Sequence, residues 1–176
     1  MIEHEMRKKS REMDADFAIE VFRKAPYITM SMISDNNMPY CIPLSMVVVS
    51  NDTFYFHCAK DGQKLDCIKQ NNNVCLSAVT KCKPTIGPKD NSFTLEYKSA
   101  VAYGQATIVT DHEERIEAMR AICERFLPNH MAAFDNAVAQ SMAHTEIVKI
   151  TLIAPPKGKR KQYDNNGEEM KYGRKE

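Results

Sequence analysis

The 176-residue sequence lacks long apolar runs, a strong excess of either charge and any C-x-x-C motif. No stretch approaches the roughly 20 apolar residues that a membrane-spanning helix requires. The formal net charge is +1, so bulk electrostatics give no reason to expect nucleic acid as a partner. The first residues, "MIEHEMRKKSREM", are charged and contain no apolar core of a secretion signal. These absences predict a cytoplasmic protein that binds neither membranes nor nucleic acid.

The cysteines and histidines do not form a metal-binding pattern. Zinc sites usually use two closely spaced pairs of ligands, and no such pairs occur here. We therefore expect no metal, and in a reducing cytosol we expect the cysteines to be free thiols that act as small apolar side chains. The six cysteines are Cys41, Cys58, Cys67, Cys75, Cys82 and Cys123.

Closely spaced strand patterns dominate the chain. Long helices do not separate most successive strands, so a doubly wound parallel sheet is disfavoured. The pattern predicts a mainly β protein, an antiparallel barrel with flanking helices. We expect one domain over residues 1–154 and a polar tail over 155–176 that is loose or wraps a partner. Strands are expected at 27–33, 40–49, 53–59, 74–80, 92–110 and 146–153, and helices at 10–24, 62–71, 111–127 and 131–142.

Two residues predict irregularities in these strands, and one segment predicts a connection. Pro43 cannot donate a hydrogen bond to a neighbouring strand, so it indicates a sheet edge, a bulge or a break that faces a ligand. Gly104 divides an unusually long strand pattern and indicates a bulge or bend. Residues 81–91 contain two prolines, a glycine and mixed charge. This composition predicts a long connection.

The segment "YFHCAKDGQKLDCI" (55–68) places a strand, a glycine turn and the start of a helix in close succession. Backbone N–H groups at a helix N-terminus attract anions. Gly62 allows close approach of a ligand, and Lys60 and Lys64 add positive charge. The P-loop and G-x-G-x-x-G motifs are absent. The segment alone is therefore compatible with a seat for one phosphate monoester or with a plain solvated corner.

Three blocks carry a family resemblance: "PYCIPLSMV", "YFHCAKDGQKLDCIKQNNNVCLSAV" and "EYKSAVAYGQATIV". They resemble successive blocks of FMN-binding split-barrel proteins related to pyridoxamine 5'-phosphate oxidase. The similarity runs from about Phe17 to Ile153 and is greatest to the nitroimidazole-resistance (Nim-type) branch. That branch has an H-x-A-x-x-G-x-K-x-D pattern, which matches His57, Ala59, Gly62, Lys64 and Asp66.

The resemblance implies a six-stranded antiparallel split barrel that forms a homodimer with FMN at the subunit interface. It places Ser99 and Val101 of the long bent strand at the cofactor. The resemblance implies that the isoalloxazine ring is lined by Pro43, Leu44 and Ser45. It implies that the flavin and its ribityl chain lie along His57, Cys58 and Ala59. The phosphate would be held by Gly62 and Lys64.

The leading functional hypothesis is an FMN-dependent oxidoreductase. It would pass electrons from NADH or NADPH to a small acceptor such as a nitroaromatic. No general acid or base is evident, and His57 is the one catalytic candidate. The alternatives are a pyridoxamine phosphate oxidase, a non-catalytic flavin- or haem-binding module, and a structural dimer with a decayed pocket. The sequence leaves open whether "KGKRK" (157–161) contacts the flavin, a partner subunit or water.

Overall fold

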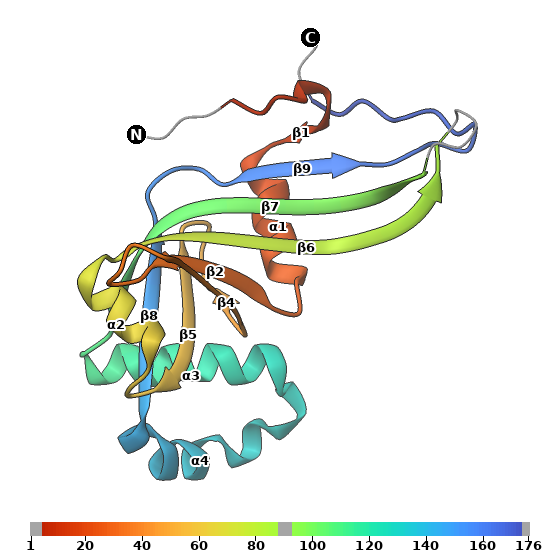
Figure 1. The fold of residues 1–176 in the computed structure, drawn as a ribbon. Helices are drawn as coiled ribbons and strands as arrows, with labels where there is room; N and C mark the ends of the chain where they lie inside the picture. The colour runs from red at the N-terminus through yellow and green to blue at the C-terminus, as the bar shows by residue number, and fades with distance from the viewer. Residues whose placement is uncertain (1–4, 88–92, 174–176) are drawn as a thin grey trace. The chain divides into compact units, whose positions relative to one another are not determined.

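The computed structural model describes residues 5–87 and 93–173, and antiparallel strands form most of it (Figure 1). The strands are β1 (Glu12–Met13), β2 (Ile28–Ile33), β3 (Pro39–Leu44), β4 (Val47–Val48), β5 (Thr53–Ala59), β6 (Asn73–Ile86), β7 (Phe93–Ile108), β8 (Thr145–Leu152) and β9 (Lys157–Lys161). The α-helices are α1 (Ala15–Lys24), α2 (Gln63–Gln70), α3 (His112–Phe126) and α4 (Phe134–Ser141). The 3-10 helices are η1 (Lys9–Arg11), η2 (Pro128–Ala133) and η3 (Met142–His144).

The chain forms two compact units that share the long strands β6 and β7. The terminal unit comprises Met1–Ala25, Ser77–Val101 and Pro156–Glu176. The central unit comprises Pro26–Leu76 and Ala102–Pro155.

In the central unit the strands follow the order β3-β2-β6-β7-β8-β5-β4. The two ends of this order, β3 and β4, are consecutive in the chain and are each paired on one side, so the sheet is open. Pro43 therefore lies in an edge strand, where a missing N–H donor is tolerated. This confirms the first of the three interpretations of Pro43.

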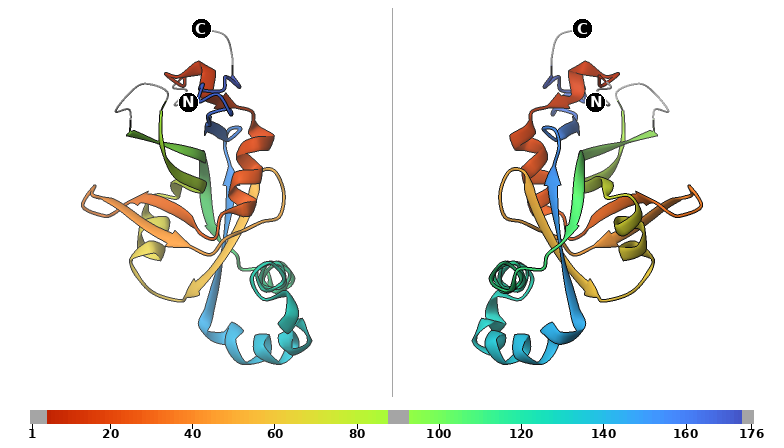
Figure 2. Two further views of the ribbon diagram at one scale, coloured as in Figure 1. Left: turned by 90° about the vertical axis from the view of Figure 1, so that its right-hand side faces the viewer. Right: turned by 90° about the vertical axis from the view of Figure 1, so that its left-hand side faces the viewer.

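Helix α3 covers β5 and β8 of the central unit. Its N-cap is Asp111, whose side chain accepts a hydrogen bond from the Glu114 N–H at 2.8 Å. Met119 and Ile122 lie in the same buried apolar cluster as Ile147 of β8. In the views of Figure 2, α3 is seen along its axis, and the chain then folds back through η2 and α4. The predicted amphipathic helix is thus confirmed, with its apolar face toward the strands.

The terminal unit contains a folded C-terminal segment instead of a loose tail. β9 pairs with β7 on one side and with β1 on the other. The Arg11 guanidinium donates to both Glu169 carboxylate oxygens, at 2.6 and 2.7 Å. This bidentate contact joins the two ends of the chain. The polar composition of 155–176 did not exclude a strand here, because backbone groups make the pairing whatever the side chains are.

One further expectation changes, and a second is not tested. Residues 81–86 belong to β6, and residues 88–91 of the expected connection lie outside the described residues. β6 has 14 residues and its neighbour β2 only six, so one end of β6 extends past β2 and can contain Pro84. β7 is one strand across Gly104, and the expected bulge or bend at this residue stays a prediction. A Cβ there would lie 2.8 Å from the Thr151 carbonyl oxygen, so glycine permits the close approach of β8.

The mainly β, antiparallel split-barrel class with flanking helices is confirmed, although the predicted number of six strands is not. The described residues form nine strands, of which β1 and β4 have two residues each. Over the same residues, no helix combines the length and apolar character needed to cross a membrane. Nor does that part of the chain contain three or more His, Cys, Asp or Glu side chains placed to hold a metal ion.

Candidate functional site

The turn between β5 and α2 presents an open helix N-terminus. Gly62 is the N-cap of α2 and has φ +121°, a conformation that side-chain-bearing residues rarely adopt. Its carbonyl accepts from the Leu65 N–H at 2.9 Å. In the described part of the chain, the N–H groups of Gly62, Gln63 and Lys64 have no hydrogen-bond partner. A Cβ built at Gly62 would meet nothing within 4 Å, so a ligand can approach this turn closely.

Cys58 lies in the electrostatic field of two opposite charges at this corner. Partial burial raises the pKa of the Cys58 thiol, the Lys64 ammonium lowers that pKa and the Glu146 carboxylate raises it. The net pKa lies above the ordinary value, so the group is a neutral thiol at neutral pH. Lys64 therefore acts as a point charge close to the end of β5, and Cys58 is not an activated nucleophile.

Strand β8 lies directly beside the predicted site residues of β5. The register places His57, Cys58 and Ala59 opposite Ile147, Glu146 and Thr145, respectively. Sequence reasoning assigned no role to these three β8 residues, because the pairing of β5 with β8 joins segments about ninety residues apart.

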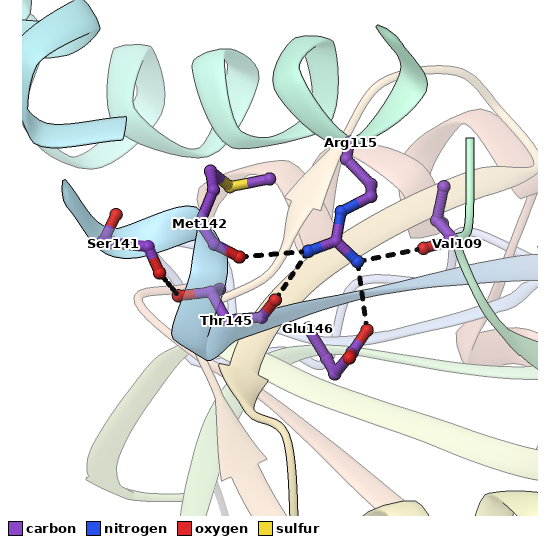
Figure 3. Close-up of polar contacts among 6 residues, drawn as sticks. All are labelled: Val109, Arg115, Ser141, Met142, Thr145 and Glu146. Atoms are coloured by element: carbon purple, nitrogen blue, oxygen red, sulfur yellow. Dashed lines mark hydrogen bonds and ion pairs between the residues drawn. The ribbon is translucent and has the colours of Figure 1, made fainter. Parts of the chain in front are cut away.

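Arg115 of α3 fixes the start of β8 (Figure 3). Its guanidinium nitrogens donate to the Glu146 carboxylate at 3.1 Å and to the Thr145 carbonyl at 2.7 Å. They also donate to the carbonyls of Met142 and Val109, both at 3.3 Å. One side chain thus neutralises Glu146 and satisfies three backbone acceptors. No local pattern in the sequence indicates this role, because three of the four acceptors lie 27 to 31 residues later in the chain.

A second polar group on α3 fixes the position of β5. The Tyr55 hydroxyl donates to a Glu114 carboxylate oxygen at 2.6 Å, and the Lys149 ammonium donates to the same oxygen at 3.0 Å. These hydrogen bonds lower the pKa of Glu114. Successive strand residues alternate between faces, so His57 lies on the same face of β5 as Tyr55.

His57 is a neutral imidazole at neutral pH. The residue is exposed at the end of β5, yet desolvation by the surrounding protein lowers the pKa of its ring. A neutral imidazole presents one N–H donor and one acceptor nitrogen. His57 can therefore hydrogen-bond to a ligand without adding charge.

The structure brings some of the predicted site residues together. His57, Cys58, Ala59, Gly62 and Lys64 form one corner of the central unit. Pro43 and Leu44 end β3, and Ser45 begins the two-residue link to β4. β4 pairs with β5 through Val47 and Tyr55, so this link lies within a few residues of β5.

Ser99 and Val101 lie on β7 in the terminal unit, opposite Lys159 and Lys157 of β9. Their place beside the corner of the central unit stays a prediction. The register also places two lysines of "KGKRK" next to these predicted flavin residues. The sequence alone left open what "KGKRK" contacts.

The chemistry of the corner suits a phosphate group. Three backbone N–H groups without a partner lie at a helix N-terminus, a Cβ at Gly62 would meet no atom within 4 Å, and Lys64 supplies a positive charge. Neither Cys58 nor His57 adds negative charge. One phosphate monoester would therefore meet donors, while Arg115 neutralises Glu146. Asp61 precedes Gly62 in the turn, and Asp66 lies in the first turn of α2.

Solved structures with the same fold come from several bacteria. A candidate 5-nitroimidazole antibiotic resistance protein from Bacteroides thetaiotaomicron has a TM-score of 0.70 and 21% identity, covering 89% of this chain and 95% of its own. A flavocytochrome from Azotobacter vinelandii has a TM-score of 0.77 and 16% identity, and the match covers 90% of this chain and 73% of the flavocytochrome chain. An FAD- and haem-binding protein from Mycobacterium smegmatis has a TM-score of 0.74 and 15% identity, and the match covers 86% of this chain and 73% of the Mycobacterium chain.

Among curated proteins, none matches this chain. The sequence model of the pyridoxamine 5'-phosphate oxidase family, in contrast, matches residues 14–154. That span contains β2 to β8 and the whole corner between β5 and α2. The chain therefore belongs to the pyridoxamine 5'-phosphate oxidase family.

Proposed function

We propose that this protein binds FMN and acts as an oxidoreductase, passing electrons from NADH or NADPH to a small acceptor such as a nitroaromatic. The observation that carries the proposal is the corner at Gly62 and Lys64. Its open backbone donors and single lysine match the terminal phosphate of a mononucleotide. The proposal places that phosphate at the N-terminus of α2.

The protein's own residues would bind and orient the cofactor. Gly62 and Lys64 hold the phosphate, and His57, Cys58 and Ala59 follow the ribityl chain and flavin along the end of β5. Pro43, Leu44 and Ser45 contact the ring. A bound flavin supplies hydride and electron-transfer chemistry, while His57 offers a neutral hydrogen-bonding group beside it.

The proposed acceptor rests on the family resemblance and on one similar protein. The Bacteroides protein is described as a candidate 5-nitroimidazole resistance protein, which favours a nitroaromatic acceptor. At 21% identity, this likeness supports the fold more strongly than it supports the substrate.

A homodimer with FMN at its interface is part of the proposal. One face of β7 exposes Phe93, Leu95 and Val101, with exposed fractions of 84%, 44% and 37%. Alternation places Ser99 on this same face. A second copy of the chain would bury these apolar side chains and bring its own contribution to the cofactor.

Two other functions remain candidates. A non-catalytic flavin- or haem-binding module is supported by the haem-binding Mycobacterium smegmatis protein and by the exposed, neutral His57, whose free nitrogen suits a haem iron. A pyridoxamine phosphate oxidase is supported by the family itself. That enzyme needs a second phosphate seat for its substrate.

One preparation separates these functions. The purified protein is examined by visible spectroscopy, and any released flavin is identified by chromatography. Bound FMN that NADH or NADPH reduces within seconds, followed by reoxidation with a nitroaromatic, supports the oxidoreductase. A haem spectrum, or FMN that neither nucleotide reduces, supports the binding module. Turnover of pyridoxamine 5'-phosphate supports the oxidase, and a protein that takes up no FMN contradicts the leading proposal.

A further inference from the structure

Two cations lie directly opposite one another in the terminal unit. The register of β7 and β9 pairs Lys98 with Arg160. Like charges in this cross-strand arrangement repel and destabilise the sheet. Such a pair calls for a compensating negative charge, either from the protein or from a ligand.

The protein supplies little compensation. Glu96, two residues before Lys98 on β7, pairs with Lys81 at 3.4 Å and accepts the Tyr163 N–H at 3.0 Å. Glu20 of α1 pairs with Lys24 at 3.0 Å. Within residues 5–87 and 93–173, no carboxylate makes an ion pair with Lys98 or Arg160. Glu96 is thus engaged by Lys81, and Glu20 is engaged by Lys24.

Positive charges from three other elements act on Lys98. Desolvation lowers its pKa most, and the positive charges of Arg160, Lys81 and Lys24 lower it further. These residues come from β9, β6 and α1, so the convergence is a property of the fold and not of one basic segment.

The Arg160 guanidinium is already held in place. Its Nε and Nη2 atoms donate to the Gln162 side-chain oxygen at 3.1 and 2.5 Å. Its central carbon lies 4.2 Å from the centroid of the Tyr172 ring. In the described structure Nη1 makes no hydrogen bond, so a donor remains for a ligand while the group stays oriented.

We propose that Lys98 and Arg160, flanked by Lys81, form a binding site for a phosphate-class anion. A phosphate between the two cations replaces their mutual repulsion by two charge-assisted interactions. Strand alternation places Lys98 on the opposite face of β7 from Ser99 and Val101. The site is therefore distinct from the proposed flavin face, and it uses none of the residues at Gly62 and Lys64.

The test compares thermal unfolding of the full-length protein in inorganic phosphate and in chloride at matched ionic strength. Phosphate should raise the wild-type melting temperature, because a ligand that binds only the folded state stabilises it. Lys98→Met should lose most of this response, and any remainder should come from the α2 corner. In chloride, Lys98→Met should melt above the wild type, because the substitution removes the repulsion. Arg160→Gln provides a second variant with the same expected loss of response.

Two controls separate this site from its surroundings. Lys159→Met removes the neighbouring charge on the other face of β9, opposite Ser99 and Glu12, and should keep the phosphate response. Lys64→Ala alters the proposed FMN phosphate seat and should also keep it. If Lys64→Ala removes the response and Lys98→Met does not, the phosphate binds at the α2 corner and this inference is wrong, whatever the fate of the FMN proposal.

Calorimetric titration then measures affinity directly. Lys98→Met should weaken phosphate binding about tenfold or more, the scale of one lost hydrogen bond to a charged group. Glycerol phosphate, a monoester, is titrated in parallel. Equal affinity for both compounds identifies a site for the terminal phosphate of a metabolite, and binding of inorganic phosphate alone identifies a closed site for the free ion. No binding of either compound to the wild type overturns the inference.

Discussion

Cys58 of β5 lies directly opposite Glu146 of β8, at the end of the strand pair that leads into the proposed phosphate seat. The positive charge of Lys64 lowers the pKa of the Cys58 thiol, and the negative charge of Glu146 raises it. Arg115 binds Glu146 at 3.1 Å and so limits the negative charge that a bound phosphate would meet. This relationship connects the corner at Gly62 and Lys64 to α3, which carries none of the residues that the family resemblance implies.

Lys64 should contribute strongly to FMN retention. Lys64→Ala removes the one lysine in the first turn of α2 and should weaken FMN binding by about 1.5–3 kcal/mol, the scale of a hydrogen bond to a charged group. Fluorescence titration of the apoprotein with FMN measures the dissociation constant. Lys60→Ala removes an exposed lysine of the turn between β5 and α2 and is the matched control. This variant should bind FMN nearly as well as the wild type. An unchanged dissociation constant in Lys64→Ala would remove this residue from the site.

Arg115 should stabilise the protein through its four acceptors. Arg115→Met leaves the mostly buried Glu146 carboxylate unpaired and should lower the free energy of unfolding by about 3 kcal/mol. Adding Glu146→Gln should restore part of this loss, because no unpaired charge remains. Urea unfolding followed by circular dichroism measures both variants. Arg23→Met, which breaks an exposed ion pair with Glu20, is the control and should change stability little. A double variant no more stable than Arg115→Met would contradict the charge argument.

Stability should fall below about pH 6.5 partly because of His57. Its folded-state pKa lies below the ordinary histidine value of 6.5. As the pH falls below 6.5, the unfolded chain binds the proton first, so stability is lost until the folded-state pKa is passed. His57→Gln should therefore lose less stability than the wild type between pH 7.5 and 5.5. Urea unfolding at several pH values measures this, with His144→Gln as the control for an exposed histidine outside the corner.

NMR titration of the His57 ring provides an independent check on the same prediction. A ring that titrates at or above 6.5 would show that desolvation does not control it.

The exposed face of β7 should be a dimer interface. Leu95→Asp places a charge among Phe93, Leu95 and Val101, and should raise the dimer dissociation constant on the order of a hundredfold, because a buried unpaired charge costs several kcal/mol. Sedimentation velocity over a concentration series measures this constant. Leu127→Asp alters another exposed leucine, at the end of α3, and should leave the assembly unchanged. A wild-type protein that is monomeric at every concentration would exclude the interface.

Local patterns predicted several elements closely. The helix expected at 111–127 is α3, His112–Phe126, because its N-cap Asp111 and its apolar stripe are set by residues only a few positions apart. The strand expected at 53–59 is β5 with the same limits, bounded by a turn and by Gly62. The sequence also predicted the glycine turn that leads into α2, since the φ of Gly62 and the start of the helix depend on a short stretch of chain.

Long-range pairing decided what the sequence left open. β6 continues to Ile86 and the basic "KGKRK" segment becomes β9 because partner strands satisfy their backbone groups, and side-chain composition does not reveal such partners. The Arg115 contacts with Glu146 and Thr145, and the meeting of Lys98 with Arg160, depend on registers between distant segments. The sequence by itself thus determined the mainly β fold class and the corner at Gly62, because both depend on patterns over short stretches of the chain. Only the tertiary structure decided which charged side chains lie around this corner and along the strands, because pairing between distant strands leaves no periodic signal in the sequence.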